Sequence, residues 1–256
     1  MEICVLYLGH IACKKMFLVD TPDVQQGIRS PISALLIRHP TLGNVLYDTG
    51  NSPLFATEYS PATLQTYPIP EFISIEEALR TQGLTPGDID WIILSHLHFD
   101  HAGGLRYFRG TKAIRRVLAS EAEIKNAYFQ TVTGAGGAYC KELFDFAGIQ
   151  FCSIAQDTEL APDLKLFVQC AHTPGVLGLV LRTQTKGTVI CTSDSVYTAE
   201  SYARRLPPGG HINKSREEFF TNLEKLEAMK TACQATLFYG HDYEQVLRWS
   251  QEGSFT

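Results

Sequence analysis

Short apolar runs separated by turn residues fill the first half of the chain. Ile32–Ile37 and Val45–Tyr47 are apolar and are bounded by proline and glycine, which predicts a pair of strands. The run Ile89–Ser95 is almost continuously apolar, as expected for a strand buried on both faces. The first apolar stretch of the chain follows no positive charge and is short and interrupted, so it predicts a first strand rather than a signal peptide.

The second half repeats this rhythm. We expect further strands over Thr111–Ala119, Leu164–His172, Leu179–Thr183, Thr188–Ser193 and Ala235–Tyr239. Helical spacing is confined to a few segments. Two of them open with a serine that can cap a helix, Ser74 and Ser215, and Ser120–Phe129 is also predicted to be helical. Clustered strands with few helices predict an α+β chain in which two sheets pack face to face and helices flank them.

Two segments between these elements are candidates for substrate-facing loops. Residues 51–72 contain four prolines, which exclude a regular helix through the segment, and loops this long are often functional. Residues 127–139 include a glycine-rich stretch that predicts flexibility. The aromatic residues Phe72, Tyr128 and Tyr139 could line an apolar pocket there, and ordinary packing explains them equally well. The first segment is likewise either a lid or an ordered surface loop.

Composition narrows the class of protein. With 256 residues, 45% of them hydrophobic and 19% charged, the chain is expected to fold as a globular protein without disulfides or metal. Its 22 basic against 27 acidic residues give a net charge of -5, which argues against a nucleic-acid partner. It lacks an 18-residue apolar run, so we expect no membrane span. Seven irregularly spaced cysteines suggest a reducing, cytoplasmic setting.

The strongest chemical signal lies directly after the predicted strand that ends at Ser95. His96, His98 and His101 with Asp100 place four potential metal ligands within six positions, in a chain with only 8 histidines. Zinc favours imidazole and carboxylate ligands, and a chain that leaves a strand can turn several of them inward together. One loop cannot complete a catalytic site alone. Two further ligand types, Asp194 and His241, follow other predicted strands.

Together these segments resemble the metallo-β-lactamase superfamily and, within it, the quorum-quenching N-acyl-homoserine lactonases. The resemblance covers nearly the whole chain. The segments that carry it are Asp48–Gly50, Ser95–Gly104, Thr173–Gly175, Ser193–Thr198 and Phe238–Gln245. It implies one αββα domain over residues 1–256 that binds one or two divalent metals per chain, usually zinc. Manganese, cobalt and iron can share such ligands.

The resemblance also implies roles for individual residues. The first metal would be held by His96 and His98, the second by Asp100, His101 and His241, and both by Asp194 as a bridge. A metal-bound hydroxide would attack the substrate carbonyl. Tyr197 would hydrogen-bond the substrate. Asp100 and Tyr197 are the candidate catalytic residues. Phe72 and Tyr128 are the further candidates for substrate binding.

One position departs from the family pattern. Where relatives read T-P-G-H, this chain reads Thr173 to Gly175 followed by Val176, and valine cannot bind a metal. Three interpretations stay open: the first metal is bound weakly with extra water, His172 takes the vacant place, or only the second site is firmly occupied.

The function that the resemblance implies is hydrolysis of a cyclic ester, most like an acyl-homoserine lactone. The alternatives are a cyclic amide (γ-lactam) hydrolase, which the apparent loss of a histidine at Val176 favours, and a glyoxalase II-like thioesterase. An iron-dependent redox member and an inactive binding module are less consistent with the surviving ligand types and with the length of the chain. The expected partner is a small molecule, and the protein is expected to be a monomer or a homodimer.

Overall fold

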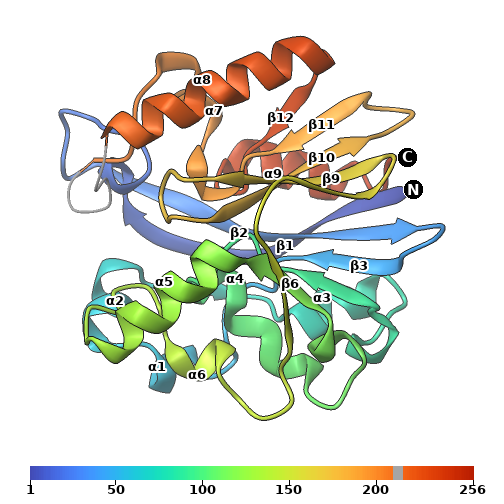
Figure 1. Cartoon of the computed structure of the whole chain (residues 1–256). Helices are drawn as coiled ribbons and strands as arrows, with labels where there is room; N and C mark the ends of the chain where they lie inside the picture. The colour runs from blue at the N-terminus through green and yellow to red at the C-terminus, as the bar shows by residue number, and fades with distance from the viewer. Residues whose placement is uncertain (210–215) are drawn as a thin grey trace.

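In a computed structural model, which describes residues 1–209 and 216–256, two β-sheets pack face to face between helices (Figure 1). The seven-stranded sheet has the order β4-β1-β2-β3-β5-β6-β7, and the five-stranded sheet has the order β12-β11-β10-β9-β8. The strands are β1 Glu2–Lys14, β2 Gly27–His39, β3 Gly43–Tyr47, β4 Glu71–Phe72, β5 Trp91–Ile93, β6 Val117–Ser120, β7 Phe151–Ile154, β8 Thr158–Ala161, β9 Leu164–Gln169, β10 Val176–Arg182, β11 Thr188–Cys191 and β12 Thr236–Phe238.

Side chains alternate in direction along a strand, so one strand contributes to the apolar cores on both faces of its sheet. Along β1, Ile3 and Val5 point into the core between the sheets, whereas Cys4 and Leu6 join the core beneath the seven-stranded sheet. Successive side chains of a strand point to opposite faces, so an unbroken apolar run supplies both cores. β10 contributes Leu177, Leu179 and Leu181 to the core between the sheets.

Helices form the two outer layers. The α-helices are α1 Phe55–Glu58, α2 Pro61–Thr66, α3 Ile75–Thr81, α4 Phe99–Ala102, α5 Glu121–Val132, α6 Lys141–Phe144, α7 Ala199–Arg204, α8 Arg216–Cys233 and α9 Tyr243–Gln251. Helix α8 covers the five-stranded sheet through buried Phe219, Leu223 and Leu226. Helices α1 to α6 lie on the far side of the seven-stranded sheet (Figure 1). The predicted α+β, αββα architecture is thereby confirmed.

Most of the predicted elements are present, with changed ends. The strands predicted over Ile32–Ile37 and Val45–Tyr47 lie within β2 and β3, and the helix predicted from Ser120 is α5, whose first turn Ser120 caps. Ser74 caps α3 in the same way. The predicted cap Ser215 lies outside the described residues. Within those residues, no helix is long and apolar enough to cross a membrane.

Several predicted strands are too long; Ile89–Ser95, for example, shortens to Trp91–Ile93. Thr111–Ala119 forms a strand from Val117 only, because hydrogen-bonded turns precede it, including one from Arg116 N–H to Ala113 C=O at 2.8 Å. The strand predicted over Leu164–His172 ends at Gln169. His172 has a backbone φ of 74°, in the left-handed region, so the chain turns sharply there and cannot continue the strand.

Residues 51–72 are an ordered segment rather than an open loop. The prolines do exclude one continuous helix, but two short helices, α1 and α2, fit between them, and Pro61 occupies the first turn of α2. β4 then pairs with β1 at the edge of the sheet.

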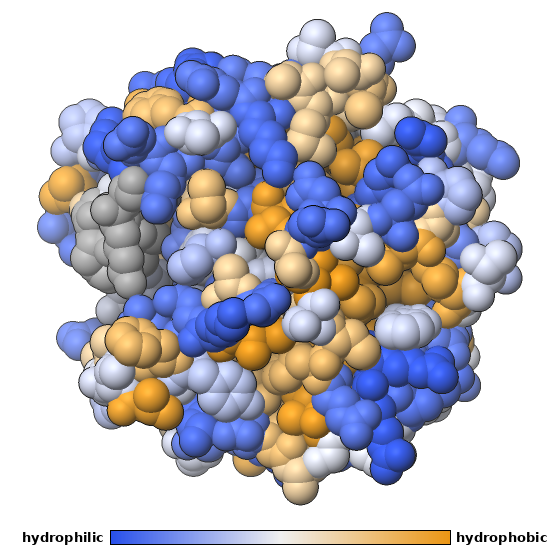
Figure 2. Space-filling model, in the orientation of Figure 1, coloured by the Kyte–Doolittle hydropathy of each residue, from blue (hydrophilic) through white to orange (hydrophobic). Residues whose placement is uncertain are grey.

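Figure 2 shows polar side chains over much of the visible face, with apolar groups near its middle.

Candidate metal centre

The histidine-rich segment crosses from a strand into a helix. After β5, His96 and His98 have left the sheet, and α4 begins at Phe99, so Asp100 and His101 lie in its first turn. Gly103 and Gly104 follow, and a Cβ atom on either would collide with the backbone of residues 49–52. Two glycines therefore allow the Asp48–Gly50 turn to pack directly against the helix that carries Asp100 and His101.

Three histidines converge at one corner of the site. His96 Nε2 lies 3.1 Å from His98 Nδ1, and His172 Nε2 lies 3.2 Å and 3.0 Å from these two atoms. His96 is fully buried, and the side chain of His172 is 8% exposed. Because His172 adopts a left-handed backbone conformation, its side chain turns toward the other two rather than continuing along β9.

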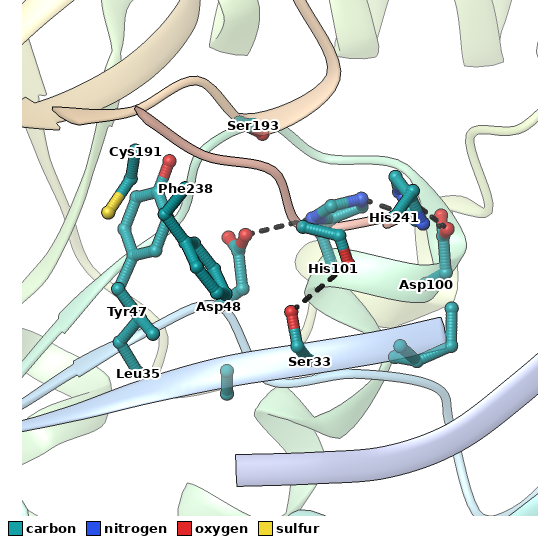
Figure 3. Close-up of a pocket in the computed structure, with 13 residues that line it drawn as sticks. Ser33, Leu35, Tyr47, Asp48, Asp100, His101, Cys191, Ser193, Phe238 and His241 are labelled. Atoms are coloured by element: carbon teal, nitrogen blue, oxygen red, sulfur yellow. Dashed lines mark hydrogen bonds and ion pairs between the residues drawn. The ribbon is translucent and has the colours of Figure 1, made fainter. Parts of the chain in front are cut away.

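A second group lies beside the first. Asp100, His101 and His241 are all buried, with Asp100 Oδ2 at 3.7 Å from His101 Nε2 and 3.9 Å from His241 Nε2. His241 comes from the chain that leaves β12, so distant parts of the sequence meet here. Figure 3 shows His101, His241 and Asp100 grouped on one side of a small pocket whose other wall contains Tyr47 and Phe238.

Asp194 lies between the two groups. It follows β11 in a short 3-10 helix, Ser193–Ser195. Its Oδ2 atom lies 3.4 Å from His172 Nε2 and 3.7 Å from His96 Nε2. Its Oδ1 atom lies 3.3 Å from His101 Nε2 and 3.1 Å from His241 Nε2. One carboxylate thus faces both groups, with a different oxygen toward each.

The residues of both groups fit a pair of divalent metals. Atoms that bind one zinc at about 2.0–2.1 Å in a tetrahedron lie about 3.3 Å apart, close to the spacings within the histidine corner. Within the described chain, three buried atoms that face one another have no hydrogen-bond partner: His101 Nε2, His241 Nε2 and Asp194 Oδ1. Buried polar atoms are rarely left without a partner, so such a cluster is suited to a cation.

The outer nitrogens of the histidines are held by other side chains. Asp48 Oδ2 lies 2.8 Å from His101 Nδ1, and Ser30 Oγ lies 2.9 Å from His241 Nδ1. Tyr197 Oη lies 2.8 Å from His172 Nδ1. Such partners fix which ring nitrogen points inward. The Asp48 turn belongs to the segments that carry the family resemblance, but no role was predicted for it. No motif in the sequence marks Ser30, which is far from the other site residues along the chain.

Charges in this buried site shift several pKa values strongly. Burial alone would lower the pKa of His101, but Asp194, Asp100 and Asp48 outweigh it and raise that pKa well above its usual value. Burial opposes ionisation of Asp194, but His241, His101 and His96 hold its pKa well below the usual range. Burial raises the pKa of Asp100. Without a cation, the site therefore holds protons in its place.

The geometry answers the question that Val176 raised. Val176 is fully buried in β10, paired with Gln169 of β9, and lies outside the histidine corner. His172 occupies that corner, so the second of the three interpretations agrees with the structure. The ligand-type side chain of this segment belongs to His172, where the backbone turns, whereas position 176 begins β10.

The aromatic candidates differ in whether their rings lie beside the histidines of the site. Tyr197 is 7% exposed, and its ring centre lies 5.4 Å from that of His241. Tyr139 stacks against His98, with ring centres 4.4 Å apart. Phe72 contacts Phe55, and Tyr128 contacts Phe144 of α6, so the ring contacts of these two are with packing partners.

An aromatic residue that sequence analysis missed, Tyr67, belongs to the apolar cluster around Tyr197. The proline-rich segment that contains it gave no pattern to single it out.

Both candidate loops are attached to the backbone of one residue of the histidine-rich segment. Phe99 N–H donates to Ala138 C=O at 3.0 Å, and Phe99 C=O accepts from the Tyr59 hydroxyl at 3.0 Å. The Phe99 ring packs against Tyr59 and Tyr67, with ring centres 4.9 Å and 6.0 Å apart. Residues 51–72 and 127–139 therefore meet between His98 and Asp100, which places both beside the candidate metal ligands.

Comparison with known proteins identifies the family of this chain. The family model of the metallo-beta-lactamase superfamily matches residues 27–241. The N-acyl homoserine lactonase AiiB of Agrobacterium fabrum is 30% identical over 95% of this chain and 94% of its own length. An N-acyl homoserine lactonase of Bacillus cereus is 30% identical over 79% of this chain and 78% of its own.

A solved structure has the same fold. It is an N-acyl homoserine lactone hydrolase with the product N-hexanoyl-L-homoserine bound at its catalytic metal centre, and it superposes with a TM-score of 0.83 at 24% identity, covering 96% of this chain and 95% of that one. The match of the family model and the length of the alignments with the lactonases, together with the paired ligand groups, lead to one conclusion. The chain belongs to the metallo-beta-lactamase superfamily, in the branch of the N-acyl homoserine lactonases, and is a metallohydrolase.

Proposed function

We propose that this protein opens the ring of N-acyl homoserine lactones with the help of two divalent cations, zinc in the first instance. The observation that carries the proposal is the pair of buried ligand groups joined by Asp194. The first cation would be held by His96, His98 and His172, the second by Asp100, His101 and His241, and Asp194 would contact both. When bound, such a pair makes hydroxide available near neutral pH.

Tyr197 is proposed to donate a hydrogen bond to the substrate. Because His172 directs Nε2 toward the corner, its Nδ1 carries the proton and donates to the Tyr197 oxygen, 2.8 Å away. The hydroxyl proton of Tyr197 is then free to point at a substrate oxygen. Burial raises the pKa of Tyr197, so the hydroxyl keeps this proton. A donor placed where negative charge develops lowers the barrier to ring opening.

Asp100 is proposed to act on the leaving oxygen. Burial raises the pKa of its carboxyl group in the metal-free protein. Ring opening of a lactone produces an alkoxide, which needs a proton. Asp100 lies within the second ligand group, so it is close to where the substrate must bind.

The acyl part of the substrate is proposed to lie against an apolar cluster next to Tyr197. Its members come from β1, β2 and the segment between them, from residues 51–72, and from the chain before and after α7. They are Cys13, Phe17, Leu18, Val19, Ile28, Tyr67, Tyr197 and Leu206. We propose that residues 51–72 and 127–139 complete the substrate pocket, because both are attached to Phe99. Phe72 and Tyr128 support the pocket through Phe55 and Phe144 rather than through the cluster itself.

The function is tested by incubating the protein with a panel of N-acyl homoserine lactones, with and without a chelator. Ring opening is measured by mass spectrometry. γ-Lactams and glutathione thioesters are included as competing substrates. Chelator-sensitive opening of the lactones is expected. Turnover of a lactam or thioester without turnover of any lactone would contradict the proposal. The absence of a histidine at position 176 favoured a lactam, and the group of His96, His98 and His172 supports an intact ligand set instead.

Replacing Tyr197 with phenylalanine is expected to lower kcat by about 100-fold while changing KM much less. The ring and its packing stay, and the hydroxyl that faces His172 and the substrate is lost. Steady-state kinetics on one lactone give both constants, and the metal content of the variant is measured in parallel. A fall in metal content that accounts for the whole loss of kcat would show that the hydroxyl only supports His172.

Metal binding is expected to release protons at neutral pH. The pKa of His101 is raised by Asp194, Asp100 and Asp48, and that of His241 by Asp194, so both rings hold protons in the metal-free protein. Only neutral imidazole binds a metal, so metal affinity should fall as the pH falls through these raised pKa values. Calorimetry in two buffers of different ionisation enthalpy counts the protons. Identical heats in both buffers would contradict this expectation.

A further inference from the structure

Glu123, in the first turn of α5, is a buried carboxylate that bonds to residues beside the candidate metal ligands, and it is 0% exposed. Within the described chain, no lysine or arginine forms an ion pair with it. Its Oε1 atom accepts from Leu97 N–H and from the Tyr139 hydroxyl, both at 2.9 Å. Its Oε2 atom accepts no hydrogen bond from the described residues, and the buried Thr173 hydroxyl lies near the carboxylate. Burying a carboxylate with neutral donors alone is costly, so the position calls for an explanation.

The two donors and Thr173 belong to three segments that surround the same histidine corner. Leu97 lies between His96 and His98, and Thr173 follows His172. Tyr139 is the aromatic residue whose ring lies 4.4 Å from the ring of His98. Glu123 is thus connected by hydrogen bonds to residues beside His96 and His98, and it lies near Thr173, the neighbour of His172.

We propose that Glu123 is a positioning residue that sets the spacing of His96, His98 and His172 and ties residues 127–139 to them through Tyr139. The inference rests on the proposed binding of a metal by these three histidines. The Leu97 peptide cannot rotate without losing its acceptor, and it fixes the direction in which the two flanking histidines leave the chain. Thr173, which follows the left-handed turn at His172, lies near the same carboxylate.

The chemistry of the groups around Glu123 predicts how substitutions will differ. The Leu97 N–H can only donate, so it needs an acceptor at position 123. The hydroxyls of Tyr139 and Thr173 can donate or accept. Glu123→Gln therefore keeps an oxygen for Leu97 and offers its amide hydrogens to the hydroxyls. Glu123→Ala removes the acceptor and leaves a buried N–H unpaired. Tyr139→Phe removes only the connection to residues 127–139.

The test is a titration of the metal-free, full-length protein with zinc against a chromophoric chelator, which resolves two successive affinities. Glu123→Ala is expected to weaken the binding of one metal by about 10- to 100-fold and to leave the other within a few-fold of the wild type. Glu123→Gln is expected to restore most of that loss. In a protein that already carries His172→Ala, adding Glu123→Ala should cause little further loss, because both changes act on the same corner.

The outcomes separate this inference from the proposed function. Two wild-type affinities for zinc in Glu123→Ala, with only a lowered melting temperature, would show that Glu123 serves folding alone and would overturn the inference. A wild-type protein that binds no metal pair would overturn the inference and the proposed function together. If Glu123→Ala does not fold, the Tyr139→Phe variant decides: a smaller loss confined to the same metal supports the inference, and unchanged affinities contradict it.

Discussion

Replacing His172 with alanine is expected to remove one of two bound metals and to lower kcat/KM by more than about 100-fold. Substitution of residues that merely support metal ligands typically costs 10- to 100-fold, and a ligand itself should cost more. His172 Nε2 lies within 3.4 Å of ligand atoms of His96, His98 and Asp194. Its removal leaves the first cation with an incomplete set of protein ligands, while the Asp100–His101–His241 group keeps its members.

The measurement is metal content per chain after dialysis, with kinetics on the same samples. Val176→Ala is the matched control, because it changes the position that the sequence motif suggested and leaves His172 in place. We expect this control to bind two metals. A third variant combines His172→Ala with Val176→His, and it should not recover the lost metal, because position 176 is fully buried within β10 and away from the corner. Recovery would show that the sequence motif, not the backbone turn, identifies the ligand.

The local part of the site could be predicted from the sequence because its residues are neighbours along the chain. His96, His98, Asp100 and His101 follow one apolar strand, so one turn is enough to bring them together. Asp194 and His241 could be singled out because each follows a strand and carries a ligand-type side chain. The sheets could be predicted equally well, since the nearly continuous apolar runs of β1 and β2 reflect burial on both faces.

The remaining part depends on backbone conformation and on contacts between distant segments. A left-handed conformation is uncommon outside glycine, and its enrichment at histidine is too weak to mark His172 in advance, so the end of β9 was placed three residues too late. The contacts of Ser30 with His241, and of Glu123 with Leu97, join positions separated by 211 and 26 residues. Only the packing of the sheets and of α5 brings these atoms together, and no local pattern encodes it.

Replacing Asp194 with asparagine is expected to have the largest effect, a loss of both metals and of more than about 1000-fold in kcat/KM. The substitution keeps the shape of the side chain and removes its charge. Asp194 is the carboxylate that faces both histidine groups, with one oxygen toward His172 and the other toward His241. A neutral amide cannot balance two dications in a site this buried.

Asp163→Asn is the matched control for this variant, because Asp163 pairs with His39 away from the site, at 2.9 Å, and undergoes the same chemical change. Metal content after equilibrium dialysis and kcat/KM are measured for both variants. Retention of two metals by Asp194→Asn would contradict the bridging position. Retention of one would mean that the two groups bind independently. Loss of both would mean that both cations need the negative charge of Asp194, and that neither group of histidines is a complete site without it.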